Sequence, residues 1–369
     1  MNLRTLLSHY AEHAIESKEF ELNEDFNKRL DDGDIEGYEL ILRKPDGEEQ
    51  PVSPVSAALF VSDLPAYRQL VKDDIAVKRH EVLMLDDFPT NYGAYDKLLN
   101  LVRQRAAVVP FVGAGFSVSA GCPAWSDYIV SQAVRSGLDE EDVKAQLKSG
   151  QHEKLMNEVV DRLSINVFQR DFSTQFENGR ISPSLSPSLE LMDLFNGCYI
   201  TTNFDRVLEK SHAEKRPFEE KVVGRDDTGR FLKAIYRSGK YLLKLHGNID
   251  EHRDRILTRA EYDLGYGNEE IDYTLPIPKT LKRVFGSFTV LFVGCSLISD
   301  RYLTVLKEAH DAAPEFLPEH FAIMVAPNDA EERIERDRFT ANHGITPIWF
   351  PDGEWDKPAE ILKLLKIER

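Results

Sequence analysis

After residue 95, short apolar runs alternate with longer amphipathic stretches. The runs are rich in Val, Ile, Leu and Phe and contain few polar positions, which is typical of strands in a parallel sheet that is covered on both faces. The longer stretches have the spacing of helices that bury one face. Strands are expected at residues 106–112, 198–201, 241–245, 289–293, 321–325 and 346–350. Helices are expected at residues 126–135, 139–148, 152–162, 187–195, 205–213, 229–237, 299–310, 328–340 and 357–367.

This alternation predicts an α/β fold class, a doubly wound parallel sheet, for residues 96–369. Residues 1–95 have a different pattern and are expected to form an N-terminal accessory or assembly region. A strand-like run at residues 38–42 follows a helical spacing carried by Leu3, Leu6, Leu7, Tyr10 and Ile15. The apolar run at residues 57–61 fits either an exposed interface, which would make the protein a homo-oligomer, or helices that pack against the sheet.

Charge restricts the possible partners. The 369 residues include 63 acidic and 46 basic side chains, a net charge of −17, and residues 1–90 hold 20 of the acidic and 10 of the basic ones. This excess of negative charge argues against a broad phosphate-binding surface, so direct sequence-specific binding of nucleic acid is not expected. No apolar run reaches the roughly 20 residues that a membrane span needs, and no secretory signal is visible. A cytoplasmic protein without membrane contact is therefore expected.

Two of the expected strands end in residues suited to a nucleotide. The first runs into Gly113-Ala114-Gly115-Phe116-Ser117, where glycine permits a tight turn and close approach of backbone N–H groups to a pyrophosphate. The usual third glycine is absent, so a purely structural turn explains the pattern about as well. The second strand ends in Thr201-Thr202-Asn203-Phe204-Asp205. These residues either cap the next helix or place the Asn203 amide and the Asp205 carboxylate in a ligand crevice.

Two further strands end in a similar way. One precedes His246-Gly247, and a histidine at a strand end suits proton transfer near neutral pH, although such a histidine is more often structural. We expect the His246 side chain to face a crevice and to support little of the core. The other strand precedes Gly294-Cys295-Ser296, with Ser299 or Asp300 placed to cap the next helix. Because parallel strands end at the same edge of a sheet, the four turns are expected to converge on one crevice.

The four motifs in this order, GAGFSVSAGCPAW, TTNFD, KLHGN and VGCSLISD, resemble the sirtuin superfamily. Within it they are most similar to the sirtuin-like NAD-hydrolysing domains of bacterial antiphage defence, HerA-associated or Thoeris-like. The resemblance covers about residues 106–310 and implies a Rossmann-like NAD-binding domain. It implies catalytic roles at the nicotinamide ribose for Asn203, Asp205 and His246. It also implies contacts with the dinucleotide for Gly113, Ala114, Gly115, Phe116, Ser117, Trp125, Thr202, Gly294 and Ser296.

The chain departs from deacylating sirtuins in two places. Those enzymes read Pro-Asp-Phe-Arg after the glycine-rich turn, whereas this chain has Pro123-Ala124-Trp125-Ser126. Trp125 keeps an aromatic wall, but the Asp and the Arg are missing. Deacylating sirtuins also carry a zinc ribbon with two Cys-x-x-Cys pairs. The three scattered cysteines of this chain cannot build such a ribbon. No zinc or other metal is therefore expected, and the sequence favours NAD+ hydrolysis over protein deacylation.

The expected activity is hydrolysis of NAD+ to nicotinamide and ADP-ribose, with NAD as the substrate. His246 is expected to act as general base, Asn203 to hold the attacking water or the ribose hydroxyls, and Asp205 to orient the nicotinamide carboxamide. The alternatives are an NAD-dependent protein deacylase and a non-catalytic module that binds NAD or ADP-ribose. The resemblance further implies depletion of NAD+ on phage infection (abortive infection), a homo-oligomer, and a separate sensor such as a HerA-type ATPase.

Overall fold

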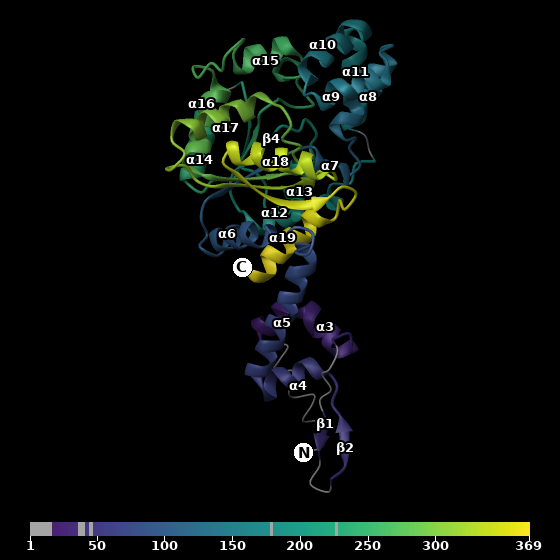
Figure 1. The fold of residues 1–369 in the computed structure, drawn as a ribbon, viewed down its shortest axis with the longest axis vertical. Helices are drawn as coiled ribbons and strands as arrows, with labels where there is room; N and C mark the ends of the chain where they lie inside the picture. The colour runs from purple at the N-terminus through teal and green to yellow at the C-terminus, as the bar shows by residue number, and fades with distance from the viewer. Residues whose placement is uncertain (1–16, 36–40, 44–46, 178–179, 226–227) are drawn as a thin grey trace. The chain divides into compact units, whose positions relative to one another are not determined.

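The computed structural model describes residues 17–35, 41–43, 47–177, 180–225 and 228–369. The chain divides into two compact units, with the division after Val82 (Figure 1). The sequence predicts a division at residue 95, and that boundary stays a prediction. It falls inside α6 (Asn91–Arg103), a helix that packs on strand β9 (Ile345–Pro351) of the larger unit.

The smaller unit is a helical cluster with a short hairpin. It comprises α2 (Lys18–Leu22), α3 (Glu24–Asp32), β1 (Ile41–Arg43), β2 (Glu49–Pro51), α4 (Val55–Ser62) and α5 (Leu64–Val82). The two strands pair antiparallel, and the buried side chains of Phe26, Leu30, Leu59, Tyr67 and Leu70 form the core. The apolar run 57–61 contributes mainly to this core, because Ala57 and Leu59 are buried and Val61 alone is 36% exposed. The helical pattern expected over residues 3–15 lies outside the described residues.

The larger unit is built on a parallel sheet of seven strands in the order β5-β6-β4-β3-β7-β8-β9. The strands are β3 (Val108–Val112), β4 (Tyr199–Thr201), β5 (Glu220–Val223), β6 (Tyr241–Lys244), β7 (Thr289–Val293), β8 (His320–Ala326) and β9 (Ile345–Pro351). All pairs are parallel, which confirms the predicted Rossmann-like, doubly wound α/β fold class. The chain reverses its direction of strand addition between β3 and β7, where such sheets bind ligands.

Helices cover both faces of the sheet (Figure 1). One face carries α14 (Gly229–Tyr236), α16 (Pro276–Ser287), α17 (Arg301–Ala312) and α18 (Ala330–Asn342). Their apolar side chains pack on inward-facing residues such as Phe111, Ile200 and Phe292. The other face carries α6, α12 (Ser188–Leu194), α13 (Val207–Ala213) and α19 (Lys357–Glu368).

The chain between β3 and β4 forms a helical cap with its own hydrophobic core. It contains α7 (Gly115–Val118), α8 (Trp125–Arg135), α9 (Glu140–Lys148), α10 (His152–Leu163), α11 (Ile165–Phe176) and the short η1 (Pro183–Leu185). Two elements that follow β6 are η2 (His252–Asp254) and α15 (Arg259–Tyr266), and α15 contacts α10. The aromatic rings of Tyr128, Phe168, Phe172 and Phe176 dominate the core of the cap.

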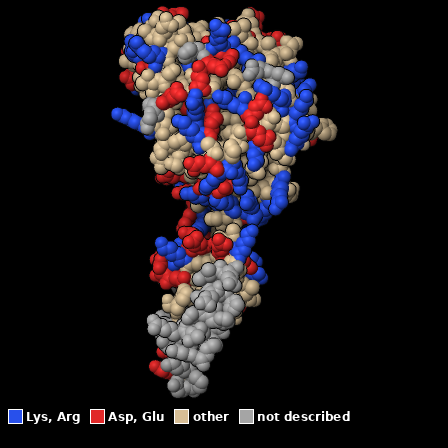
Figure 2. Space-filling model, turned by 180° about the vertical axis from the view of Figure 1, so that it is seen from behind, with Lys and Arg blue, Asp and Glu red and all other residues tan. Residues whose placement is uncertain are grey.

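The strands and helices predicted after residue 95 are all present, with ends shifted by at most two residues, whereas residues 38–40 of the strand predicted at 38–42 lie outside the described residues. The pattern missed strand β5 and helices α6, α11, α15 and α16, as well as α4 and α5 in residues 56–71, where no single period is visible. Strand β5 reads Glu-Lys-Val-Val and lies at the edge of the sheet, so it has only half of the apolar signal of an inner strand. No described helix is long and apolar enough to cross a membrane. On the face in Figure 2, acidic and basic side chains of the larger unit are interspersed.

Candidate active site

The glycine-rich turn after β3 packs directly on the turn after β7. The N–H of Gly113 donates to the carbonyl of Val293 at 2.8 Å, and the N–H of Gly115 donates to the carbonyl of Gly294 at 2.9 Å. A Cβ atom on Gly113 would lie 2.4 Å from the Gly294 oxygen. Gly294 itself has φ +65°, and a Cβ there would lie 2.7 Å from the Phe116 nitrogen. Close packing of two turns therefore requires these glycines, whatever ligand they also contact.

Asn203 joins the end of β4 to the same turn. Its Nδ2 donates to the carbonyl of Gly113 at 3.0 Å and to the Ser117 hydroxyl at 3.2 Å. The Asn203 N–H donates to Thr201 Oγ1 at 3.0 Å, and that hydroxyl donates to the carbonyl of Val112 at 2.7 Å. Asn203 is 6% exposed, so its amide is held in a fixed position at the carboxyl edge of the sheet. The structure thus brings Asn203 together with the first motif.

Asp205 is buried two residues further on. Its Oδ1 accepts the N–H of Val207 at 2.8 Å at the start of α13, as expected of a helix-capping carboxylate. Burial raises the pKa of Asp205, while the nearby Lys244 and the hydrogen bonds to the carboxylate lower it. The side chain is 4% exposed. Capping accounts for this position, and the contact with a nicotinamide carboxamide stays a prediction.

Lys244 is a fully buried cation that holds the turn around Asp205, and the sequence analysis did not single it out. Its Nζ donates to the carbonyl oxygens of Phe204 at 3.2 Å and Asp205 at 2.5 Å, and lies 3.0 Å from Glu209 Oε1. A lysine at the end of an otherwise apolar strand was the available signal. Because three oxygens surround the ammonium, it fixes the backbone between Asn203 and α13.

His246 follows β6, the strand next to β4, and it is buried. Its Nε2 lies 3.1 Å from the hydroxyl of Tyr266, and its ring contacts those of Tyr262 and Tyr266 edge-on. The expectation that His246 supports little of the core is wrong, because the side chain is 5% exposed and packs on two tyrosines. Burial lowers its pKa to about 3, so the imidazole is neutral near pH 7 with a free lone pair, and the same burial makes it a weaker base than an exposed histidine.

Asp300 stands beside His246 as a second buried carboxyl group. Its Oδ1 lies 3.8 Å from His246 Nε2, and its Oδ2 accepts the hydroxyl of Tyr262 at 3.3 Å. It also caps α17 by accepting the N–H of Tyr302 at 3.4 Å, as the sequence predicted. Burial raises the pKa of Asp300 to about 7. The two tyrosines were missed, although the capping box of Thr258 and Glu261 is a sequence signal for the helix that carries them.

The remaining predicted contact residues surround these turns. Trp125 lies in the cap, and its ring centroid is 5.7 Å from that of Phe204, the residue after Asn203. Phe116 is buried and its carbonyl accepts the hydroxyl of Ser186. Ser117 is buried and Thr202 half-buried, while Ala114 is half-buried beside the exposed Gly115. Ser296 is exposed, and its carbonyl accepts a hydrogen bond from Arg336.

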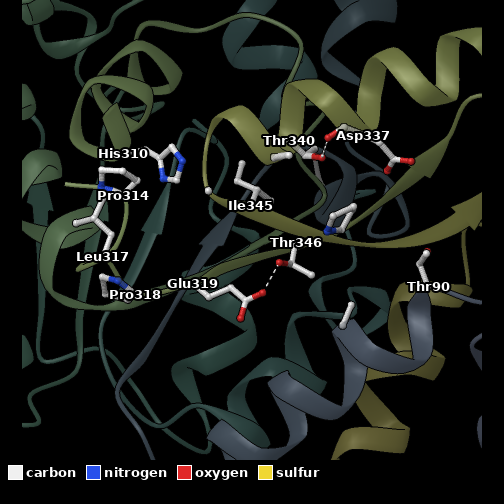
Figure 3. A pocket seen from close by; sticks show the side chains of 14 residues that line it. Thr90, His310, Pro314, Leu317, Pro318, Glu319, Asp337, Thr340, Ile345 and Thr346 are labelled. Atoms are coloured by element: carbon white, nitrogen blue, oxygen red, sulfur yellow. Dashed lines mark hydrogen bonds between the residues drawn. The ribbon is translucent and has the colours of Figure 1, made fainter. Parts of the chain in front are cut away.

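Two cavities lie near opposite edges of the sheet. One of about 350 Å³ is lined by Tyr262, Asp300 and Arg301, beside the strand-end turns. The other, of about 480 Å³, lies at the amino ends of β8 and β9 and is lined by His310, Glu319 and Thr346 among others (Figure 3). Doubly wound sheets bind nucleotides at the carboxyl edge, so the cavity in Figure 3 is not the site expected for NAD. Within the described parts of the chain, no group of three or more His, Cys, Asp or Glu side chains is placed to hold a metal ion.

Comparison with known families matches residues 197–348 to the model of the SIR2-like domain. The matched range contains the turns after β4, β6 and β7, with Asn203, His246 and Asp300. Residues 197–348 are thus similar to the SIR2-like domain. The resemblance to sirtuin-like domains is thereby confirmed. The glycine-rich turn at residues 113–117 precedes the matched range, and it joins the SIR2-like domain through its contacts with Asn203 and Gly294.

Three curated proteins that are similar to this chain each carry the name NAD(+) hydrolase ThsA. The protein of Enterococcus faecium is 25% identical over 244 residues, 64% of this chain and 47% of the relative. That of Bacillus cereus (strain MSX-D12) is 24% identical over 245 residues, 64% of this chain and 46% of the relative. That of Cytobacillus dafuensis is 25% identical over 230 residues, 62% of this chain and 41% of the relative. The chain thus spans less than half of each relative's length.

Proposed function

We propose that this chain is an NAD+ glycohydrolase that releases nicotinamide and ADP-ribose. The observation that carries the proposal is the geometry of Asn203 and His246. The fixed amide is bonded to the glycine-rich turn, and the neutral imidazole ends the neighbouring strand at the same edge of the sheet. The activity named for the three relatives supports the same chemistry.

In the proposed reaction, the glycine-rich turn lies against the dinucleotide, and its glycines contribute the close approach of backbone to ligand, because the N–H groups of Gly113 and Gly115 are already donated to Val293 and Gly294. The bond from ribose to nicotinamide breaks toward a cationic sugar, and water attacks the anomeric carbon. Asn203 holds the water or the ribose hydroxyls, and His246 accepts a proton from one of them. The leaving group is a cationic pyridinium, so departure requires no metal. Asp205 is proposed to orient the carboxamide of nicotinamide. The residues proposed to line the nucleotide are Phe116, Ser117, Trp125, Thr202, Gly294 and Ser296.

Nicotinamide release tests the function directly. Purified full-length chain is incubated with NAD+, with and without an acyl-lysine peptide, and the products are separated by chromatography. We expect nicotinamide and ADP-ribose in equal amounts without peptide. Release that depends on the peptide, with formation of an acylated ADP-ribose, would establish the deacylase instead. Saturable binding of NAD+ without any product, in the presence of every activating condition tried, would establish the non-catalytic module.

Asn203→Ala is expected to lower the rate of nicotinamide release by about 10²–10³-fold, because the residue positions a reacting group. Since Asn203 and His246 serve the same step, the two losses should not add in the double variant. Asn100→Ala is the matched control, since Asn100 is exposed and its amide donates to Asp96 on the same helix, α6. Additive losses in the double variant would show that the two residues act in separate steps.

The biological setting is proposed on the same basis. The chain acts as a cytoplasmic effector that depletes NAD+ during phage infection, and a homo-oligomer or a separate sensor protein keeps it silent until then. A HerA-type ATPase is one candidate sensor. Light scattering of the full chain, alone and mixed with such an ATPase, together with nicotinamide release from each sample, tests the assembly. Equal mass and equal turnover in both samples would exclude the ATPase as the activator.

A further inference from the structure

A network of buried polar groups surrounds one side of the His246 ring. Tyr266 and Asp300 both face Nε2, at 3.1 Å and 3.8 Å, and Tyr262 donates to the second oxygen of Asp300 at 3.3 Å. The side chains of His246 and Asp300 are 5% and 16% exposed. The other ring nitrogen, Nδ1, has no hydrogen-bond partner within the described part of the chain. One nitrogen is therefore held by protein groups, and the other bonds to none of the described ones.

We propose that Asp300 is a positioning residue for His246: its carboxylate holds the imidazole by Nε2 and balances the charge that the ring gains when Nδ1 accepts a proton. The inference rests on the proposed NAD+ glycohydrolase function. It adds Asp300 as a residue that acts through the general base His246. Capping of α17 does not require this arrangement, since Asp139 and Asp329 cap their helices from exposed positions with no histidine bonded to them.

The proton balance follows from the tautomer. A neutral His246 that carries its proton on Nε2 donates it toward Tyr266 or Asp300, which leaves the lone pair of Nδ1 free. When Nδ1 takes a proton from water or a ribose hydroxyl, an O–H bond breaks, an N–H bond forms, and the ring becomes a cation. The carboxylate at Nε2 stabilises this cation without accepting the proton itself, as in the carboxylate–histidine pairs of hydrolases.

The charge state of Asp300 depends on groups from several elements. Burial and the nearby Glu153 raise its pKa, and the hydrogen bonds from the Tyr302 N–H and the Tyr262 hydroxyl lower it, with a net result of about 7. Arg301 is already paired with Glu153 at 2.6 Å and Asp263 at 2.7 Å, so its charge is largely balanced. The titratable and charged groups that face Asp300 are Glu153, Tyr262, Tyr266, His246, Cys295, Arg301 and Tyr302. His152, Lys307 and His343 line the cavity beside it.

Asp300→Asn is the principal test, because asparagine keeps the helix cap and the shape but loses the charge. We expect kcat/KM for NAD+ to fall by about 10²–10⁴-fold. In the wild-type chain kcat/KM should fall as the pH drops through about 7, because protonation removes the carboxylate. The variant should lack this dependence. Tyr262→Phe should shift it to higher pH, since loss of the hydroxyl raises the pKa of Asp300.

Asp329→Asn is the matched control, since Asp329 caps α18 in the same way from an exposed position. It should keep both the rate and the pH profile of the wild type. An Asp300→Asn variant with the rate and profile of the wild type would overturn the proposal. Should that variant fail to fold, an unchanged pH profile in Tyr262→Phe would overturn it equally.

A measurement without turnover separates this inference from the proposed function. In ¹⁵N-histidine-labelled full-length chain, the Nε2 resonance of His246 should show the Nε2–H tautomer and shift with a midpoint near pH 7. The shift should vanish in Asp300→Asn and persist in Asp329→Asn. An Nδ1–H tautomer, or no shift, would overturn the role of Asp300 even in an active enzyme. The expected shift in a chain that releases no nicotinamide would support the pair and reject the NAD+ hydrolase.

Discussion

Replacing His246 by glutamine is expected to lower the rate of nicotinamide release from NAD+ by about 10²–10⁴-fold, because the variant has no group able to accept a proton near pH 7. The imidazole is neutral in the wild type, since burial lowers its pKa to about 3. Glutamine keeps an amide near the hydroxyl of Tyr266. The lost ring contacts with Tyr262 and Tyr266 should lower the free energy of unfolding by about 1 kcal/mol.

The rate is measured by chromatography under the conditions that activate the wild type, and circular dichroism and thermal melting check the fold. His320→Gln is the matched control, because His320 is 1% exposed and accepts the N–H of Val290 at 3.1 Å at the amino end of β8. This control loses an equally buried histidine away from the candidate site. Its folded fraction should turn over within a few-fold of the wild type. A His246→Gln rate in that same range would remove the general base from the mechanism.

Lys244→Met is expected to give the largest loss of stability, about 3 kcal/mol in the free energy of unfolding of the larger unit. Methionine retains the length of the buried side chain but removes the donor to the Asp205 carbonyl and one of the donors to the Phe204 carbonyl, which still accepts the N–H of Ile249. We expect this loss in the free energy of unfolding to stay below the upper limit for breaking a buried ion pair, because the Glu209 side chain is 23% exposed. The turn that carries Asn203 should loosen, and nicotinamide release should fall with it.

Denaturant unfolding followed by tryptophan fluorescence measures this loss, since Trp125, Trp349 and Trp355 all lie in the larger unit. Lys366→Met is the control, because its ion pair with Asp193 is at the surface and should contribute about 0.5 kcal/mol. Equal unfolding midpoints for the two variants would show that Lys244 does not hold the turn.

The α/β fold class could be read from the sequence because inner parallel strands are apolar along their whole length. β3 and β7 are buried at every position, and so is most of β8, so their apolar runs stand out against the helices around them. The edge strand β5 has one buried position in four and went unrecognised. Helix α11 was missed for another reason. Its Phe168, Phe172 and Phe176 have helical spacing, but their rings pack inside the core of the cap, which is separate from the core against the sheet.

The candidate site could be located from the sequence, but its internal contacts could not. Asn203 and His246 stand out because each follows a short apolar strand, and parallel strands end at one edge. Asp300 was recognised only as a helix cap. Its distance of 3.8 Å from His246 depends on the packing of α15 and α17, which no local pattern encodes.

The sequence by itself determined the alternation of strands and helices, the four polar strand ends and the resemblance to sirtuin-like domains, because these features are local in the chain. Tertiary structure decided which groups are buried and which groups meet. Burial keeps His246 neutral and raises the pKa of Asp300 to about 7. Close packing of two turns makes Gly113 and Gly294 necessary. Both effects arise from neighbours that are distant in sequence, since desolvation and steric exclusion act through space rather than along the chain.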